Sequence, residues 1–228
     1  MESIKRVNHR ITTQNSEYND IAHLPLFRQK MINWDMTIAL GYWLETAEKL
    51  VPGYQITKVN LPIIEQLIYY AMGDERFSGD LTRGVGLLGP TGTGKTKTME
   101  ILNEFIREDQ ISYFRFGELR PFNFKILSVN ELIADFGKRG WDALDEWSVR
   151  NVLCIDDFAA EDQPAKYYGN EVDVLGKVIE ERYRLRKITH LTSNIKHEAI
   201  KDKYGDRVSS RMNEMFNFLK LIDRNFRN

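Results

Sequence analysis

Residues 89–96 read Gly-Pro-Thr-Gly-Thr-Gly-Lys-Thr. The glycines of this stretch, followed by lysine and threonine, have the spacing of a phosphate-binding loop, the Walker A motif. The apolar run Val85–Leu88 precedes the loop directly, and a helical pattern begins at Lys95. A chance match of the motif seldom has a strand on one side and a helix on the other. The sequence therefore predicts a P-loop α/β protein.

The residue types of the loop suit the binding of a nucleoside triphosphate. Glycines let successive backbone N–H groups curl around an anion, and the helix that follows adds the positive end of its dipole. Lys95 reaches the β- and γ-phosphates, and the hydroxyl of Thr96 is a ligand for Mg²⁺. The predicted cofactors are ATP and Mg²⁺. The predicted nucleotide-binding residues are Gly89, Pro90, Thr91, Gly92, Thr93, Gly94, Lys95, Thr96 and Lys97.

A second motif supplies the carboxylates that such a loop requires. The apolar run Val152–Ile155 leads into Asp156 and Asp157, as in a Walker B strand. Asp156 is expected to hold Mg²⁺ through its water shell, and Asp157 is placed to be the general base that polarises the attacking water. The alternative is a helix cap or a solvated turn, and the upstream Walker A loop makes it the weaker interpretation.

Further polar residues follow the next predicted strand. Ile188–Thr192 runs into Ser193 and Asn194. Because parallel strands end at one edge of the sheet, Asn194 is expected beside the phosphate, where it orients the lytic water or contacts the γ-phosphate. A simple turn asparagine is the alternative. Arg207 and Arg211 lie four residues apart on one helical face, and spacing alone gives them no catalytic role.

The rest of the chain shows two kinds of sequence pattern. From Gly84 onward, short apolar runs alternate with helical patterns, which is typical of a parallel sheet covered by helices. We expect a core over residues 81–228, preceded by a small helical partner-binding region over residues 1–80. The expected strands are Val85–Leu88, Phe124–Val129, Val152–Ile155, His190–Thr192 and Phe218–Ile222. The expected helices are Asp35–Leu50, Pro62–Met72, Lys95–Glu108, Asn130–Lys138 and Val172–Arg186.

The composition is that of a globular protein without a membrane span: 228 residues, 42% hydrophobic, 29% charged and a net charge of −1. The single Cys154 argues against disulfides, so we expect a cytoplasmic protein with no membrane partner. The charge is unevenly distributed, since residues 182–228 hold 12 Lys and Arg against 5 Asp and Glu. This segment either faces an anion, such as phosphate, nucleic acid or an acidic subunit, or is a solvated face.

Residues 111–123 interleave aromatic and basic side chains ahead of the second core strand. Such a pattern suits a surface on which the bases of single-stranded DNA stack. A hairpin that buries the rings is the favoured alternative. The residues concerned are Tyr113, Phe114, Arg115, Phe116, Arg120 and Phe122.

The ordered set of motifs resembles the AAA+ ATPases of the DnaC/IstB type, which are bacterial helicase loaders and transposition helpers. The resemblance covers about residues 60–228 and implies a five-stranded parallel sheet sandwiched by helices. Only 17 residues follow Arg211, too few for a C-terminal lid domain, and we expect none; this shortness agrees with the resemblance. Besides the Walker motifs, it rests on Leu-Ser-Val-Asn-Glu-Leu at 127–132, Val-Ile-Glu-Glu-Arg-Tyr at 178–183, Leu-Thr-Ser-Asn at 191–194 and Gly-Asp-Arg-Val-Ser-Ser-Arg-Met at 205–212.

The same resemblance implies roles for the polar residues. Asn194 would be the family's first sensor. Arg211 would be the arginine finger that reaches the nucleotide of the adjacent protomer, with Arg207 supporting it or substituting for it. A guanidinium in trans neutralises charge on the transferring phosphoryl group, so activity would depend on a ring or helical homo-oligomer. Asp157 departs from the more usual Glu, which shortens the reach of the expected base.

The favoured hypothesis is an ATPase that acts on DNA and loads a replicative helicase onto single strands. An IstB-like helper, working with a transposase on duplex DNA, shares every motif. Two hypotheses from other classes remain: a P-loop small-molecule kinase, and a nucleotide-gated binding module with little hydrolysis. Against the kinase, the sequence has no arginine-rich lid, and Asp157 with Asn194 suits activation of water.

Overall fold

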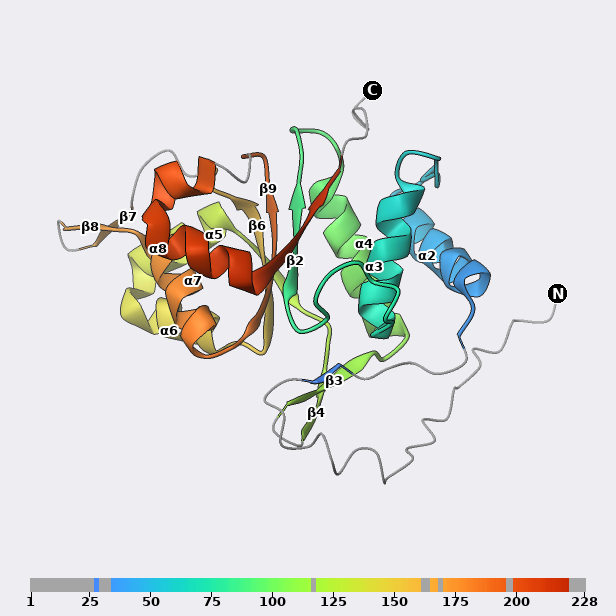
Figure 1. Cartoon of the computed structure of the whole chain (residues 1–228). Coiled ribbons are helices and arrows are strands. Elements are labelled where there is room, and N and C mark those ends of the chain that lie inside the picture. Colours follow the sequence, from blue (N-terminus) through green and yellow to red (C-terminus); the bar gives the residue numbers. More distant parts are fainter. Residues whose placement is uncertain are drawn as a thin grey trace.

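The protein is built around a parallel sheet of five strands in the order β10-β2-β9-β6-β5 (Figure 1). The computed structural model describes residues 27–28, 34–115, 118–160, 165–167, 170–195 and 199–221. All neighbouring pairs in this sheet are parallel, and each of the five predicted strands is confirmed. The strands are β2 Gly84–Leu88, β5 Lys125–Ser128, β6 Val152–Phe158, β9 Ile188–Ser193 and β10 Phe216–Lys220.

Helices cover both faces of this sheet (Figure 1). One face carries α2 Met36–Leu50, α3 Leu61–Met72 and α4 Lys95–Glu108. The other face carries α5 Val129–Arg139, α6 Trp141–Val149, α7 Val174–Arg184 and α8 Ala199–Met215. Each set of helices has its own apolar cluster with the sheet residues beneath it, as expected when the strands of a parallel sheet are buried on both sides.

The two predicted N-terminal helices are confirmed, and they pack on the P-loop helix. Asp35 caps α2 by accepting a hydrogen bond from the N–H of Ile38 at 3.1 Å. Trp43 of α2 is fully buried, and its ring lies 5.8 Å from that of Phe105 in α4. Gly73, with φ of 64°, ends α3. Both helices therefore share one core with the sheet, and their role in binding a partner stays a prediction.

Residues 111–123 contain a hairpin beside the sheet. β3 Ser112–Arg115 and β4 Glu118–Pro121 pair antiparallel, and the short β1, Phe27–Arg28, pairs with β3. Tyr113 and Phe122 are completely buried. The interpretation that the hairpin buries its rings is confirmed for these two residues, so neither is a platform for nucleobases. The side chains of Phe114 and Phe116 lie outside the described part.

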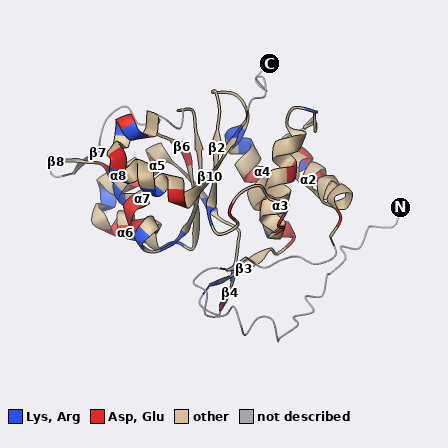
Figure 2. Cartoon of the chain, viewed as in Figure 1, with Lys and Arg blue, Asp and Glu red and all other residues tan. Residues whose placement is uncertain are grey.

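The surface of the C-terminal helices mixes both charges. Figure 2 shows acidic and basic positions interspersed on α7 and α8. Arg184 pairs with Glu181, and Lys201 pairs with Asp206 at 2.7 Å. Acidic residues of α7 that precede residue 182 thus balance part of the basic C-terminal segment.

A separate ribbon is formed by β7 Ala165–Tyr167 and β8 Asn170–Val172. None of the helices in the described ranges has the length and apolarity to cross a bilayer.

Candidate nucleotide-binding site

The P-loop connects the end of β2 to the start of α4. Gly92 and Gly94 have φ values of 86° and 82°, a left-handed conformation that glycine adopts without strain. At Gly89 the constraint is space, because a Cβ atom there would lie 2.3 Å from the carbonyl oxygen of Leu221. These glycines therefore permit the tight turn, directly before a helix N-terminus, that a phosphate chain requires.

Lys95 is the first residue of α4, and its ammonium folds back onto the loop. Its Nζ donates to the carbonyl oxygens of Gly89 and Pro90, both at 2.9 Å, and to Oδ1 of Asn194 at 2.6 Å. The residue is only 5% exposed. Burial lowers the pKa of Lys95, while the nearby Asp157 and Asp156 act in the opposite direction. A buried ammonium whose acceptors are neutral oxygens fits the charged oxygens of a phosphate chain.

Asp156 joins the P-loop to the neighbouring strands. The hydroxyl of Thr96 donates to its two carboxylate oxygens at 2.8 and 3.1 Å, and that of Thr192 donates to Oδ1 at 2.7 Å. The structure thus brings the two predicted metal ligands, Thr96 and Asp156, into contact. Hydroxyl and carboxylate oxygens are the hard ligands that Mg²⁺ prefers, so this donor set fits the ion.

Asp157 lies at an irregularity in the sheet. The register of β6 against β9 shifts between Ile155 and Phe158. Asp157 has φ of 54°, and its side chain is exposed although Asp156 and Phe158 on either side are buried. A bulge redirects a side chain, and a positive φ at a residue other than glycine often marks a functional position. Asp157 is therefore accessible to water, as a general base must be, and its catalytic role stays a prediction.

Thr192 is a site residue that sequence reasoning missed. Its Oγ1 accepts a hydrogen bond from the N–H of Asp157 at 2.9 Å while donating to Asp156. One buried hydroxyl thus fixes both acidic residues relative to β9. The two-residue period of a strand places Thr192 on the same side as Asn194, but that pattern does not show the bulge at Asp157 on which the role of Thr192 depends.

Arg207 and Arg211 lie together on α8, after a break in the helix at Gly205. Glu180 Oε1 on α7 forms an ion pair with Arg207, at 2.9 Å from its Nε, and with Arg211, at 2.5 Å from its Nη1. The guanidinium of Arg211 also lies 5.4 Å from the ring centre of Tyr183. Within the described residues, no hydrogen bond or ion pair joins either arginine to the P-loop. The chain brings Lys95, Asn194 and the two aspartates together, but not the two arginines.

An apolar pocket adjoins the P-loop. Its volume is about 510 Å³ including its open mouth. Part of the wall comes from the loop and the first turns of α4, and the rest comes from α3, the segment before it and the residue after β10. The lining residues are Val51, Tyr54, Asn60, Ile63, Ile64, Thr93, Gly94, Lys97, Thr98 and Leu221. Thr93, Gly94 and Lys97 were predicted as nucleotide-binding residues, but no sequence motif marks the rest of the lining, because it comes from separate segments.

No protein-family model matches the sequence, and no curated protein is significantly similar to it. Solved structures do resemble it. The crystal structure of the DnaC helicase loader has a TM-score of 0.54 and 18% identity, over 79% of this chain and 98% of that one. A putative primosome component from Streptococcus pyogenes serotype M3 has the same TM-score and identity, over 75% of this chain and 84% of that one. Two structures of DnaA also resemble this chain: DnaA from Aquifex aeolicus bound to AMPPCP, and a DnaA bound to AMPPCP and single-stranded DNA. Each has a TM-score of 0.50 and 16% identity, over 74% of this chain and 48% of the DnaA chain.

These neighbours show the class of fold, which is similar to that of the DnaC helicase loader and of DnaA. The predicted α/β fold, a five-stranded parallel sheet between two layers of helices, is thereby confirmed. Within this class the fold is similar to that of the DnaC helicase loader along nearly the whole length of that protein, which confirms the predicted resemblance at the level of the fold.

Proposed function

We propose that this chain is an ATPase that acts on DNA and loads a replicative helicase onto single strands. The observation that carries the proposal is the convergence of Lys95, Asn194, Thr96 and Asp156 at one end of the sheet. Helicase loading is supported by the similarity to the DnaC helicase loader, and action on single strands by the similarity to DnaA bound to single-stranded DNA. The chemistry at Lys95 and Asp156 itself supports nucleotide binding.

In this proposal the residues of the chain bind, orient and polarise the reactants. Lys95 exchanges the two loop carbonyls and Asn194 for phosphate oxygens. Asn194, released from the ammonium, orients a water molecule toward the γ-phosphorus, and Asp157 accepts a proton from it as the bond to the bridging oxygen breaks. Thr96 and Asp156 hold Mg²⁺, which neutralises charge on the phosphate oxygens when bound.

The apolar pocket accepts the nucleotide base in this proposal. Thr93 and Lys97 place it directly beside the loop that binds the phosphates, and Tyr54 and Ile63 give it an apolar wall. Ligand pockets are commonly apolar with few polar groups, as here. This placement supports a nucleotide rather than a free phosphate as the ligand of the P-loop.

Arg207 and Arg211 act in trans in this proposal. Glu180 pairs with both at the surface of α7. The Arg207 side chain is 74% exposed and the Arg211 side chain is 20% exposed, so a neighbouring protomer can meet Arg207 freely and Arg211 at its exposed part. The test mixes two inactive variants, Arg211→Ala and Lys95→Ala. Mixed oligomers contain interfaces that join an intact P-loop to an intact arginine, so the mixture should regain activity. If it stays inactive although both variants still assemble, the trans assignment is wrong.

The experiment that tests the function is ATP hydrolysis by the full chain, with and without single-stranded and duplex DNA, at two salt concentrations. Stimulation by single strands that fades with salt supports the helicase loader, because contacts to phosphates release counterions. A preference for duplex DNA points instead to the transposition helper. A rate that no DNA changes removes the main support, and the kinase or the nucleotide-gated module then becomes the better hypothesis.

A further inference from the structure

Four basic side chains gather at the end of the sheet opposite the P-loop. They are Arg115 of β3, Arg120 of β4, Arg182 of α7 and Lys187 just before β9, and we call them the basic cluster. Asn151 and Lys187 directly precede the parallel strands β6 and β9, whereas the P-loop follows the last residue of β2. Figure 2 shows the run of basic positions where α7 passes into β9.

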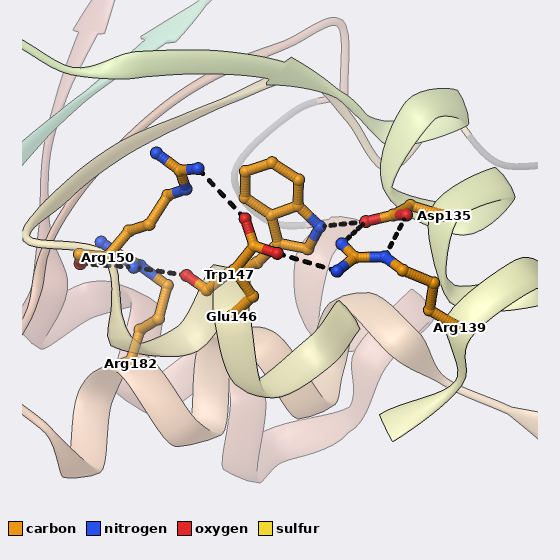
Figure 3. A network of polar contacts seen from close by, with 6 residues as sticks. All are labelled: Asp135, Arg139, Glu146, Trp147, Arg150 and Arg182. Atoms are coloured by element: carbon orange, nitrogen blue, oxygen red, sulfur yellow. Dashed lines mark hydrogen bonds and ion pairs between the residues drawn. The ribbon is translucent and has the colours of Figure 1, made fainter. Parts of the chain in front are cut away.

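Arg182 forms the buried base of this cluster. It is completely buried, and its guanidinium donates to the carbonyl oxygens of Trp147 at 2.8 Å, Arg150 at 3.0 Å and Ile188 at 2.6 Å. Figure 3 shows the contrast with the exposed arginines nearby, since Glu146 lies between Arg139 and Arg150. The exposed arginines thus pair with carboxylates, whereas the charged guanidinium of Arg182 is surrounded by neutral oxygens.

Arg120 and Lys187 form the accessible part of the cluster. Both donate to Oδ1 of Asn151, Arg120 from Nη1 at 3.1 Å and Lys187 from Nζ at 3.4 Å. Arg120 also pairs with the exposed Glu118, and its Nε is buried without a hydrogen-bond partner in the described part of the chain. Two cations therefore converge on one amide oxygen, which carries only a partial charge.

The surroundings of Lys187 are strongly positive. Burial, together with the charges of Arg115, Arg182 and Arg120, lowers its pKa to about 8. When like charges are held together where little water reaches them, the charged form of each is destabilised unless an anion binds among them. The cluster is thus arranged to gain from a negative partner.

We propose that the basic cluster is a second anion site, in which Arg120 and Lys187 bind a phosphate-type oxyanion in the position of Asn151 Oδ1. The planar fork of an arginine together with the point charge of a lysine suits such an anion. The anion comes either as free inorganic phosphate or as a phosphodiester of single-stranded DNA. The site does not depend on ATP hydrolysis, because it lies at the other end of the sheet.

The first experiment measures the melting temperature of the full chain in phosphate and in chloride at equal ionic strength. Asn151→Asp places a carboxylate between the two cations, so this variant should melt higher in chloride and gain little from phosphate. Asn151→Ala removes the competing oxygen without adding charge, so its gain from phosphate should equal or exceed that of the wild type. An equal gain from phosphate in the wild type and both variants would overturn the inference.

The P-loop also binds phosphate in the proposed function, so the same measurement is repeated in a Lys95→Ala background. A gain that persists there, and that Asn151→Asp then removes, assigns it to the basic cluster. A gain that Lys95→Ala abolishes belongs to the P-loop, and the second site would be rejected while the proposed function stands. Loss of ATP hydrolysis in Lys95→Ala is read separately, so the two ideas can fail independently.

The second experiment distinguishes the two sources of phosphate. Binding of a fluorescent oligothymidylate is measured by anisotropy over a range of salt for the double variant Arg120→Gln, Lys187→Gln. If the strand binds there, the slope of log K against log salt should become shallower by about 1.4, since each lost contact to a single strand removes about 0.7. The control, Lys138→Gln with Lys177→Gln, removes two exposed charges elsewhere. An unchanged slope together with a lost gain from inorganic phosphate identifies free phosphate, and two unchanged readouts reject the site.

Discussion

The two ends of the sheet each hold a lysine against an asparagine, and the two surroundings are opposite. Lys95 donates to Asn194 Oδ1 at 2.6 Å, and Lys187 donates to Asn151 Oδ1 at 3.4 Å. Burial lowers the pKa of both lysines. Asp157 and Asp156 oppose that effect at Lys95, whereas three arginines reinforce it at Lys187.

This difference shows what each end can accept. At the P-loop, the carboxylate of Asp156 repels a bare phosphate, so that end favours a phosphate chain accompanied by a metal ion. At the basic cluster, positive charge is in excess around Lys187, so that end favours an anion alone. Phosphate binding at the cluster should therefore not require Mg²⁺, unlike nucleotide binding at the P-loop. The following substitutions separate the two ends.

The largest effect is expected from Asp157→Asn at the P-loop end. The amide keeps the size of the side chain but cannot accept a proton from water, so ATP hydrolysis should fall by about 10²- to 10⁴-fold. Binding of a fluorescent ATP analogue should survive, because Lys95 and the loop are intact. Asp142→Asn, an exposed change on α6, is the control and should leave both quantities unchanged. Retained turnover in Asp157→Asn would exclude this residue as the base.

The apolar pocket offers a second way to separate the ends, through Ile63→Arg. A long charged side chain in the pocket should exclude the base and weaken ATP binding by about 10- to 100-fold, the range that one pocket contact provides. Tripolyphosphate has no base, so its affinity should fall far less. Competition of both ligands against a fluorescent nucleotide measures the two affinities. Equal losses would place the base elsewhere, and an unchanged melting temperature would show that the variant folds.

A matched pair on β9 compares the ends within one strand. Thr192 and Thr189 are both buried. The hydroxyl of Thr192 donates a hydrogen bond to Asp156, and the hydroxyl of Thr189 accepts one from Arg182. Thr192→Val should slow hydrolysis about tenfold, because the two aspartates lose their common anchor. Thr189→Val should cost about 1–3 kcal/mol of unfolding free energy, since a buried guanidinium donor loses its acceptor, without changing the hydrolysis rate per folded molecule. Urea unfolding and steady-state hydrolysis measure these effects, and a reversed pattern would contradict the division.

Local patterns predicted the P-loop end well. The motif at residues 89–96 fixes both a strand and a helix, and the apolar runs marked all five strands. Asn194 was expected at the phosphate edge of the sheet and lies against Lys95 there, because parallel strands end at the same edge, while its role toward water or phosphate stays a prediction. Thr192 was missed because its value lies in the bulge at Asp157, which the sequence does not announce.

The basic cluster could not be predicted from the sequence, and the reason is its construction. Arg115 and Arg120 come from a hairpin, while Arg182 and Lys187 lie some sixty residues further on, and only the packed fold brings them together. The count of charges over residues 182–228 was similarly incomplete. It excluded Glu180, which lies two residues before that segment and binds both Arg207 and Arg211.

The smallest effect concerns the pH dependence of stability at the other end, through Lys187→Met. The pKa of Lys187 is lowered from its usual 10.5 to about 8, so the unfolded chain binds this proton more tightly than the folded one. Charging Lys187 therefore destabilises the wild type below about pH 8, and the penalty disappears as pH rises from 8 toward 10.5. Methionine keeps the apolar stem without the charge, so Lys187→Met should be the more stable protein near pH 7. Its advantage should vanish by about pH 10.5.

Urea unfolding across this range measures the difference, with Lys177→Met, an exposed change on α7, as the control that should show no such trend. Phosphate should also shrink the advantage at pH 7, because a bound anion compensates the charge of Lys187. An advantage that neither pH nor phosphate alters would mean that Lys187 is uncharged or compensated in the native protein, and that the excess of positive charge at this end of the sheet is not real.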